Sequence, residues 1–172
     1  CMDVLGKQIL EAWDIHAETL DYLFEQIPAE HFDSKPVGMS GRSVSNIFAH
    51  LNNIRYSWIE LATPDLIEGL TKIPMKTKAD REAVTKAMLA EPLETSAKAM
   101  RGMLEVGLEK GKLKNFKPHT GASYSYFIAH EWYHVGEICM TLTLAGNKLD
   151  DRVLYSIWEW GRGSFWKGER SS

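Results

Sequence analysis

The chain has 172 residues and a formal net charge of −3, with 20 Lys and Arg residues against 23 Asp and Glu residues. Its composition, 44% hydrophobic and 25% charged, is typical of an ordinary globular domain, expected here to span 1–172. This charge balance provides no strong positive field for the binding of nucleic acid or anionic lipid.

Targeting and redox signals are weak in this sequence. No apolar run approaches the roughly 20 residues that span a bilayer, and the first residues lack the basic and apolar stretches of a secretory signal. Two cysteines, Cys1 and Cys139, are too few for a disulfide framework. We therefore expect a cytoplasmic protein that contacts neither membranes nor nucleic acid.

The first helical pattern lies between residues 3 and 27. Its apolar positions recur at steps of three and four, with His16 in the one longer gap. These positions are Ile9, Trp13, Leu20, Leu23 and Ile27. Pro28 ends the helix, and the stretch from there to Gly41 has the composition of a loop.

A second helix is predicted after this loop. Ser40 or Ser43 can cap it, because a short hydroxyl side chain accepts hydrogen bonds from the free amides of the first turn. The helix runs to about Leu61. Residues 62–78 then form a long connection, which could cover one end of the molecule.

The second half of the chain contains the remaining helices. From 78 to 111 the pattern is helical, and Pro92 is expected to kink or restart the helix. A fourth helix spans 122–145 and ends at Gly146, which suits a left-handed cap. A short further helix is expected at 151–161.

Four long amphipathic helices, with few alternating strand patterns and no repeat of fixed period, predict an all-α four-helix bundle with a short extra C-terminal helix. The last segment is rich in aromatic residues, and we expect it to form a strap across the bundle or a partner surface. Its aromatic residues are Trp158, Trp160, Phe165 and Trp166.

Two histidines on the fourth helix are candidate metal ligands. His130 and His134 lie one turn apart, so both rings can reach one ion. They occupy a stripe that a bundle normally fills with apolar side chains, where two adjacent imidazoles are costly without partners. A divalent metal would supply that partner, while separate hydrogen bonds within the core are the alternative.

His50 is the best third ligand, because it lies in the middle of a helix whose surrounding face is unusually polar. Three imidazoles leave at least one position of the ion open, as in a reactive site. His16 could face the same cavity, although a hydrogen bond in the core or at the surface is the simpler expectation. His31 and His119 are expected in exposed loops.

The segment from His130 to His134 also fits the H-E-x-x-H pattern of zinc peptidases, in which the glutamate activates water. Under that alternative, Glu131 is the base and Glu159 a distant third ligand. The chain lacks the strand-rich substrate edge and the extended signature of such enzymes. If the protein is not a peptidase, Glu131 is expected either to face solvent or to contact a metal ligand from outside the coordination sphere.

Glu137 lies three residues after His134, so helical geometry brings it near the same site. It could orient an imidazole, act as a catalytic acid or base, or coordinate the ion. An interhelical salt bridge is the alternative. Cys139 points elsewhere on the helix and is expected to be a small core residue.

Three segments resemble the DinB/YfiT-like superfamily of metal-dependent proteins over most of the chain. The first is Leu23–Pro28, at the end of the first helix, and the second runs from Ser43 to Trp58. The third and most specific is His130–Ile138, which reads HEWYHVGEI.

The resemblance implies an up-down-down-up four-helix bundle, frequently a homodimer, with one divalent ion held by His50, His130 and His134. Zinc and nickel are both metals of this family, and three imidazoles alone do not choose between them. The chain carries Glu137 where the family commonly has Gln.

Related branches use a low-molecular-weight thiol, such as mycothiol or bacillithiol, for S-transfer or cis-trans isomerisation. We therefore expect a metal-dependent enzyme that acts on a small molecule, either a thiol-dependent S-transferase or a hydrolase. The alternative is a non-catalytic, metal-stabilised bundle that serves as a binding or stress-response protein.

Overall fold

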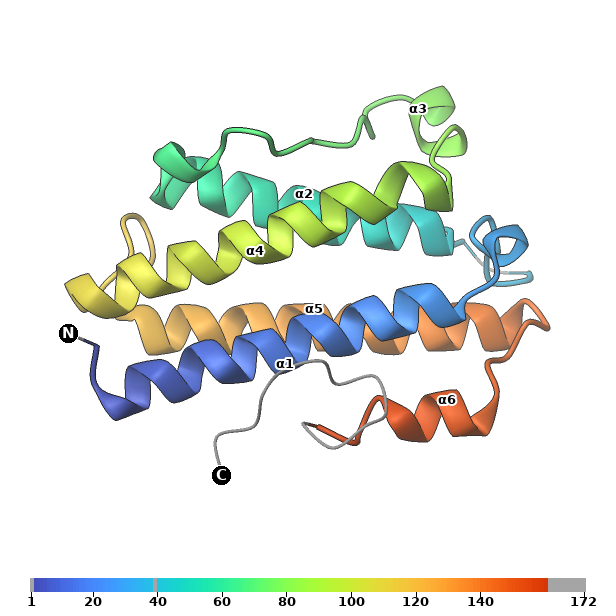
Figure 1. Ribbon diagram of the computed structural model, residues 1–172. Coiled ribbons are helices and arrows are strands. Elements are labelled where there is room, and N and C mark those ends of the chain that lie inside the picture. The colour runs from blue at the N-terminus through green and yellow to red at the C-terminus, as the bar shows by residue number, and fades with distance from the viewer. Residues whose placement is uncertain (1, 39, 161–172) are drawn as a thin grey trace.

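The computed structural model describes residues 2–38 and 40–160. Four long helices pack together along most of their lengths (Figure 1). They are α1 (Val4–Gln26), α2 (Val44–Ala62), α4 (Lys86–Lys110) and α5 (Thr120–Leu144). The shorter elements are η1 (Ala29–His31), η2 (Pro64–Leu66), α3 (Lys78–Glu82) and α6 (Asp151–Ser156).

The ends of the long helices follow local chemistry. The Asp3 side chain accepts a hydrogen bond from the amide of Gly6 at the start of α1, and Ser43 accepts one from Asn46 at the start of α2. Ser43, rather than Ser40, is therefore the cap of the second helix. Gly146, at φ +82°, ends α5 in the left-handed conformation that the sequence predicted.

The third helical region is interrupted at a different place from the one predicted. The break falls at 83–85, between α3 and α4, and α4 continues through Pro92. The prediction that the helix restarts at Pro92 is wrong, because Thr85 begins a new helix by accepting a hydrogen bond from the amide of Met88.

The helices run up-down-down-up, as the resemblance implies: α1 and α5 point one way, α2 and α4 the other (Figure 1). Two consecutive parallel helices need a connection that returns along the bundle, and the chain after α2 runs back beside that helix (Figure 1). Asn52 donates to the carbonyl of Thr71, and Asn53 donates to and accepts from the backbone of Ile73. This segment thus lies along α2 instead of covering one end of the bundle.

The apolar core consists of two clusters, one toward each end of the bundle. The first gathers around Phe24, Ile47 and Leu89, and the second around Trp13, Met100 and Phe127. Between them each long helix has a buried polar residue, and these are His16, Arg55, Ser96 and Glu131.

We call this level of the bundle the polar layer, and define it by His16, Arg55 and Glu131, of which none is more than 2% exposed. Arg55 donates from Nε and Nη2 to the two carboxylate oxygens of Glu131, at 2.7 and 2.6 Å, and from Nη1 to the carbonyl of Leu93. His16 Nε2 lies 2.7 Å from Glu131 Oε2. The layer therefore joins α1, α2, α4 and α5 at mid-height.

The segment after α5 folds back along the bundle. The helix α6 is shorter than predicted, and Trp158 and Trp160 stack on Trp132 of α5 at 5.2 and 5.9 Å. Phe165 and Trp166 lie outside the described residues. None of the helices within 2–38 and 40–160 combines the length and apolar character needed to cross a membrane.

Candidate metal centre

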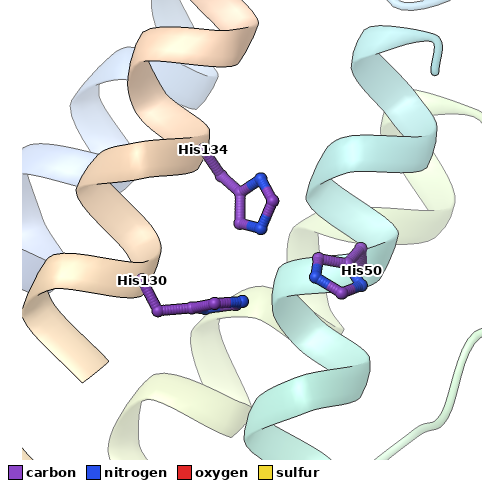
Figure 2. A group of neighbouring side chains, drawn as sticks. All are labelled: His50, His130 and His134. Atoms are coloured by element: carbon purple, nitrogen blue, oxygen red, sulfur yellow. The ribbon is translucent and has the colours of Figure 1, made fainter. Parts of the chain in front are cut away.

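Three histidines from two neighbouring helices converge at the seam between α2 and α5. Figure 2 shows His50 on α2 facing His130 and His134 on α5. Their ring centroids are 4.7–5.4 Å apart, and one potential ligand nitrogen from each ring lies within 4.8 Å of the others. The structure thus brings together the three residues that the sequence proposed as ligands.

The convergence follows from helix geometry. The four-residue step between His130 and His134 places both rings on one face of α5. His50 lies near the middle of α2, which packs against α5. His134 is buried at 4% exposure, whereas His50 and His130 are half-buried, so the cluster borders the surface.

The protonation states suit metal binding. Burial, the Arg42 guanidinium and the two neighbouring imidazoles lower the pKa of His50 to about 4. Burial and His134 also lower the pKa of His130, against the opposing effect of Glu131. A neutral imidazole is the form that ligates a metal, so both rings are available near neutral pH.

The rings fit a divalent ion in other respects. The buried Nδ1 of His130 has no hydrogen-bond partner, which is unusual for a buried polar atom. Three nitrogens about 2.1 Å from a tetrahedral ion would lie roughly 3.4 Å apart, so ring movements on the order of 1 Å would complete the coordination.

Glu137 contacts His134 at its Nδ1 atom, and Arg42 in turn binds Glu137. Oε2 of Glu137 lies 2.7 Å from His134 Nδ1, and Arg42 donates to both carboxylate oxygens of Glu137. Burial raises the pKa of Glu137, but hydrogen bonds from His134 and Arg42 outweigh that effect and lower it. Arg42 Nη2, which can only donate, also lies 3.3 Å from Nδ1, but the shorter contact is with the carboxylate, which can only accept. This contact favours the proton of His134 on Nδ1 and leaves Nε2 free as a ligand.

This geometry favours an orienting role for Glu137 over direct coordination. Glu137 does form a salt bridge, but its partner Arg42 lies in the loop before α2, so the bridge joins a loop to α5 and is not the interhelical one considered as the alternative. Arg42 was missed by the sequence reasoning. The only signal was that α5 contains no Lys or Arg, so a basic partner of Glu137 could come only from another element, but this does not single out Arg42.

The glutamate of the H-E-x-x-H segment faces away from the cluster. Both oxygens of Glu131 are engaged by Arg55 and His16 in the polar layer. Burial raises the pKa of Glu131, but the ion pair with Arg55 and the hydrogen bond from His16 outweigh it and hold the pKa well below its usual range. Peptidase chemistry therefore lacks its base, and the solvent-facing or outer-sphere roles considered for Glu131 are wrong.

The remaining histidines have separate places. His16 belongs to the polar layer, as a hydrogen-bonded core residue. His119 is exposed and caps α5 by accepting a hydrogen bond from the amide of Ala122, and His31 is half-buried in η1. Among the described residues, the group able to hold a metal consists of His50, His130 and His134.

Comparison with known proteins identifies the family. The model of the DinB family matches residues 2–151, which include all four long helices and the three histidines. No curated protein and no solved structure gives a significant match to the chain. The chain belongs to the DinB family.

Proposed function

We propose that this protein is a divalent-metal-dependent enzyme that acts on a small molecule, with His50, His130 and His134 as ligands. The observation that carries the proposal is the convergence of three imidazoles at a half-exposed seam, with the pKa values of His50 and His130 lowered. A site closed by four protein ligands would be structural, whereas three ligands leave room for a reactant.

The protein residues have distinct tasks in this proposal. Glu137 fixes the ring of His134, and Arg42 fixes Glu137 in turn. A bound zinc or nickel ion would supply Lewis acidity to a reactant entering its open position. A catalytic acid or base role for Glu137 stays a prediction, since its carboxylate lies at the edge of the cluster.

The reaction class comes from the family resemblance. Thiol-dependent S-transfer forms a carbon–sulfur bond as the bond from carbon to its leaving group breaks, and the thiol proton is released. Hydrolysis is the second class, with water in place of the thiol. Both require an open metal position and a small-molecule substrate.

Metal analysis tests the ligand set. Untagged protein purified without a metal-affinity step should contain close to one divalent ion per chain, and His130→Ala or His134→Ala should lose it. His31→Ala is the control, because His31 lies in η1 away from the cluster. Retention of the ion in both ligand variants would contradict the assignment.

A non-catalytic, metal-stabilised bundle is the second candidate. It is favoured by the chain of contacts from His134 through Glu137 to Arg42, because an ion there would also tie α5 to α2 and its preceding loop. Chelation separates the two functions. A structural metal predicts a large loss of melting temperature and no exchangeable water on the metal, whereas a reactive site predicts modest destabilisation and an accessible metal.

We also propose that the protein forms a homodimer through α5. From Tyr133 to Leu144 the exposed positions of this helix carry no charged residue, and they include Tyr133, Met140 and Leu144, which are 71%, 58% and 40% exposed. An uncharged apolar strip on a helix favours association with a similar surface. Light scattering should give the mass of two chains, and a monomer at every concentration would contradict the proposal.

A further inference from the structure

Three aromatic rings continue the α2–α5 seam directly beside the histidine cluster. We call Trp58, Phe116 and Tyr126 the aromatic shelf. Their ring centroids lie 5.1–6.1 Å from one another, so each ring contacts the other two. The ring of Tyr126 also stacks on His130, at 5.9 Å and an interplanar angle of 20°. The shelf is therefore continuous with the candidate metal centre.

Helical spacing places the shelf on one side of the cluster. Trp58 follows His50 by eight residues on α2, and Tyr126 precedes His130 by four residues on α5, so each lies on the same face as its histidine. Phe116 comes from the loop before α5. Three separate segments thus converge at this end of the seam.

The shelf packs on the core and is partly exposed to water. Phe127, which is 1% exposed, contacts all three rings and belongs to the core. Tyr126 is 40% exposed, and Trp58 and Phe116 are half-buried. The three rings are tilted by 54–70° to one another, so a planar group can stack on one ring and meet the edges of the others. Aromatic rings that are backed by a packed core and partly open to water suit such a contact with an apolar group.

The other side of the cluster has the opposite character. The Arg42–Glu137 ion pair lies beside His134, and both side chains are partly exposed, at 38% and 27%. The seam therefore changes from charged at one end, through three imidazoles, to aromatic at the other. A ligand with its reactive group at the histidines would meet very different surfaces in the two directions.

We propose that the aromatic shelf holds the planar apolar body of the substrate whose reactive group lies at the histidine cluster. The substrate class is then a small molecule with an aromatic or conjugated body attached to the reacting group. This inference rests on the proposed metal-dependent function, and it adds a subsite that the histidines alone do not define.

Two metal-binding probes that differ in an aromatic ring test the shelf. Acetohydroxamate and benzohydroxamate are titrated into protein loaded with cobalt(II), and binding is followed in the visible spectrum of the ion. Benzohydroxamate should bind about tenfold more tightly, because its phenyl ring stacks on the shelf. Equal affinities of the two probes would overturn the shelf while leaving the metal site intact.

Variants at Tyr126 locate the effect. Tyr126→Ala should reduce the affinity ratio to about two or less, whereas Tyr126→Phe should preserve it, because the ring rather than the hydroxyl makes the contact. Tyr126 is partly exposed, so both variants should fold, which circular dichroism checks. An unchanged ratio in Tyr126→Ala would overturn the inference.

Tyr155→Ala is the control. Tyr155 is an exposed tyrosine of α6, outside the histidine cluster, the aromatic shelf and the proposed dimer surface. Its replacement should leave the ratio unchanged, and an equal fall in both variants would overturn the assignment to the shelf. If neither probe changes the cobalt spectrum, the proposed metal site itself is wrong, and the shelf proposal falls with it.

Discussion

Replacing Glu131 with Gln should destabilise the protein strongly and leave its metal content unchanged. The substitution keeps the size of the side chain but removes the negative charge that faces Arg55. Arg55 and Glu131 are each 2% exposed, so the guanidinium would stay in the core without a counter-charge. Breaking a buried pair in this way costs about 3–5 kcal/mol.

Thermal unfolding gives the expected size of the effect. In a chain of this length, each kcal/mol shifts the melting temperature by about 2–4 °C, so Glu131→Gln should lower it by roughly 6–20 °C. The comparison is Glu137→Gln, whose carboxylate is 27% exposed and should matter less for folding. The double variant Glu131→Gln/Arg55→Met removes both charges and should recover part of the loss.

Two outcomes would refute this reasoning. A melting temperature within about 2 °C of the original protein would mean that Arg55 finds other partners or water in the core. Loss of metal from folded Glu131→Gln protein would mean that the polar layer helps to position the histidine ligands, against the separation described above. Differential scanning calorimetry and metal analysis on the same sample separate the two.

Three further predictions concern single contacts. Glu137→Gln should weaken zinc binding about 10- to 100-fold in a competition titration, because the amide orients His134 less firmly than a carboxylate; unchanged affinity would contradict that role. Asn53→Leu should cost about 1–3 kcal/mol in chemical denaturation and expose the Ile73 amide to hydrogen exchange, since it leaves both backbone groups of Ile73 without their partner. Two glycine replacements should have opposite effects on the stability of the single chain, measured at concentrations where it is monomeric: Gly146→Ala should cost about 1–2 kcal/mol because φ is +82°, and Gly136→Ala, on α5 with no neighbouring atom within 4 Å of the added methyl group, should gain about 0.5–1 kcal/mol. Effects of the same sign would refute the conformational argument.

The helices and the histidine cluster were predictable because both depend on spacing along one helix. The steps of three and four in the sequence identified α1, α2 and α5 to within a few residues, and the one-turn step identified His130 and His134. The direction of the helices came from the family resemblance, and the choice of His50 rested on the polar face of its helix together with that resemblance. Local periodicity does not state which helices become neighbours.

The surroundings of the cluster depended on contacts between distant segments. Glu131 follows His130 immediately, but a step of one residue turns about 100° around the helix, so it faces a different side of α5. Its partner Arg55 lies 76 residues away. The role of Arg42 was equally hard to predict from the sequence, since a loop arginine becomes a partner of Glu137 only after α2 has packed beside α5.

The division of the cluster between two helices has a consequence for how the chain assembles. α5 carries two of the imidazoles, whereas the third is 80 residues earlier on α2 and arrives only when the long-range packing is complete. An isolated α5 peptide would therefore bind a metal ion weakly, because it supplies only two ligands. The full affinity would appear only when the bundle is folded. The metal-binding affinity of a variant would then measure how well α2 packs against α5, even where the helix content of the variant is unchanged.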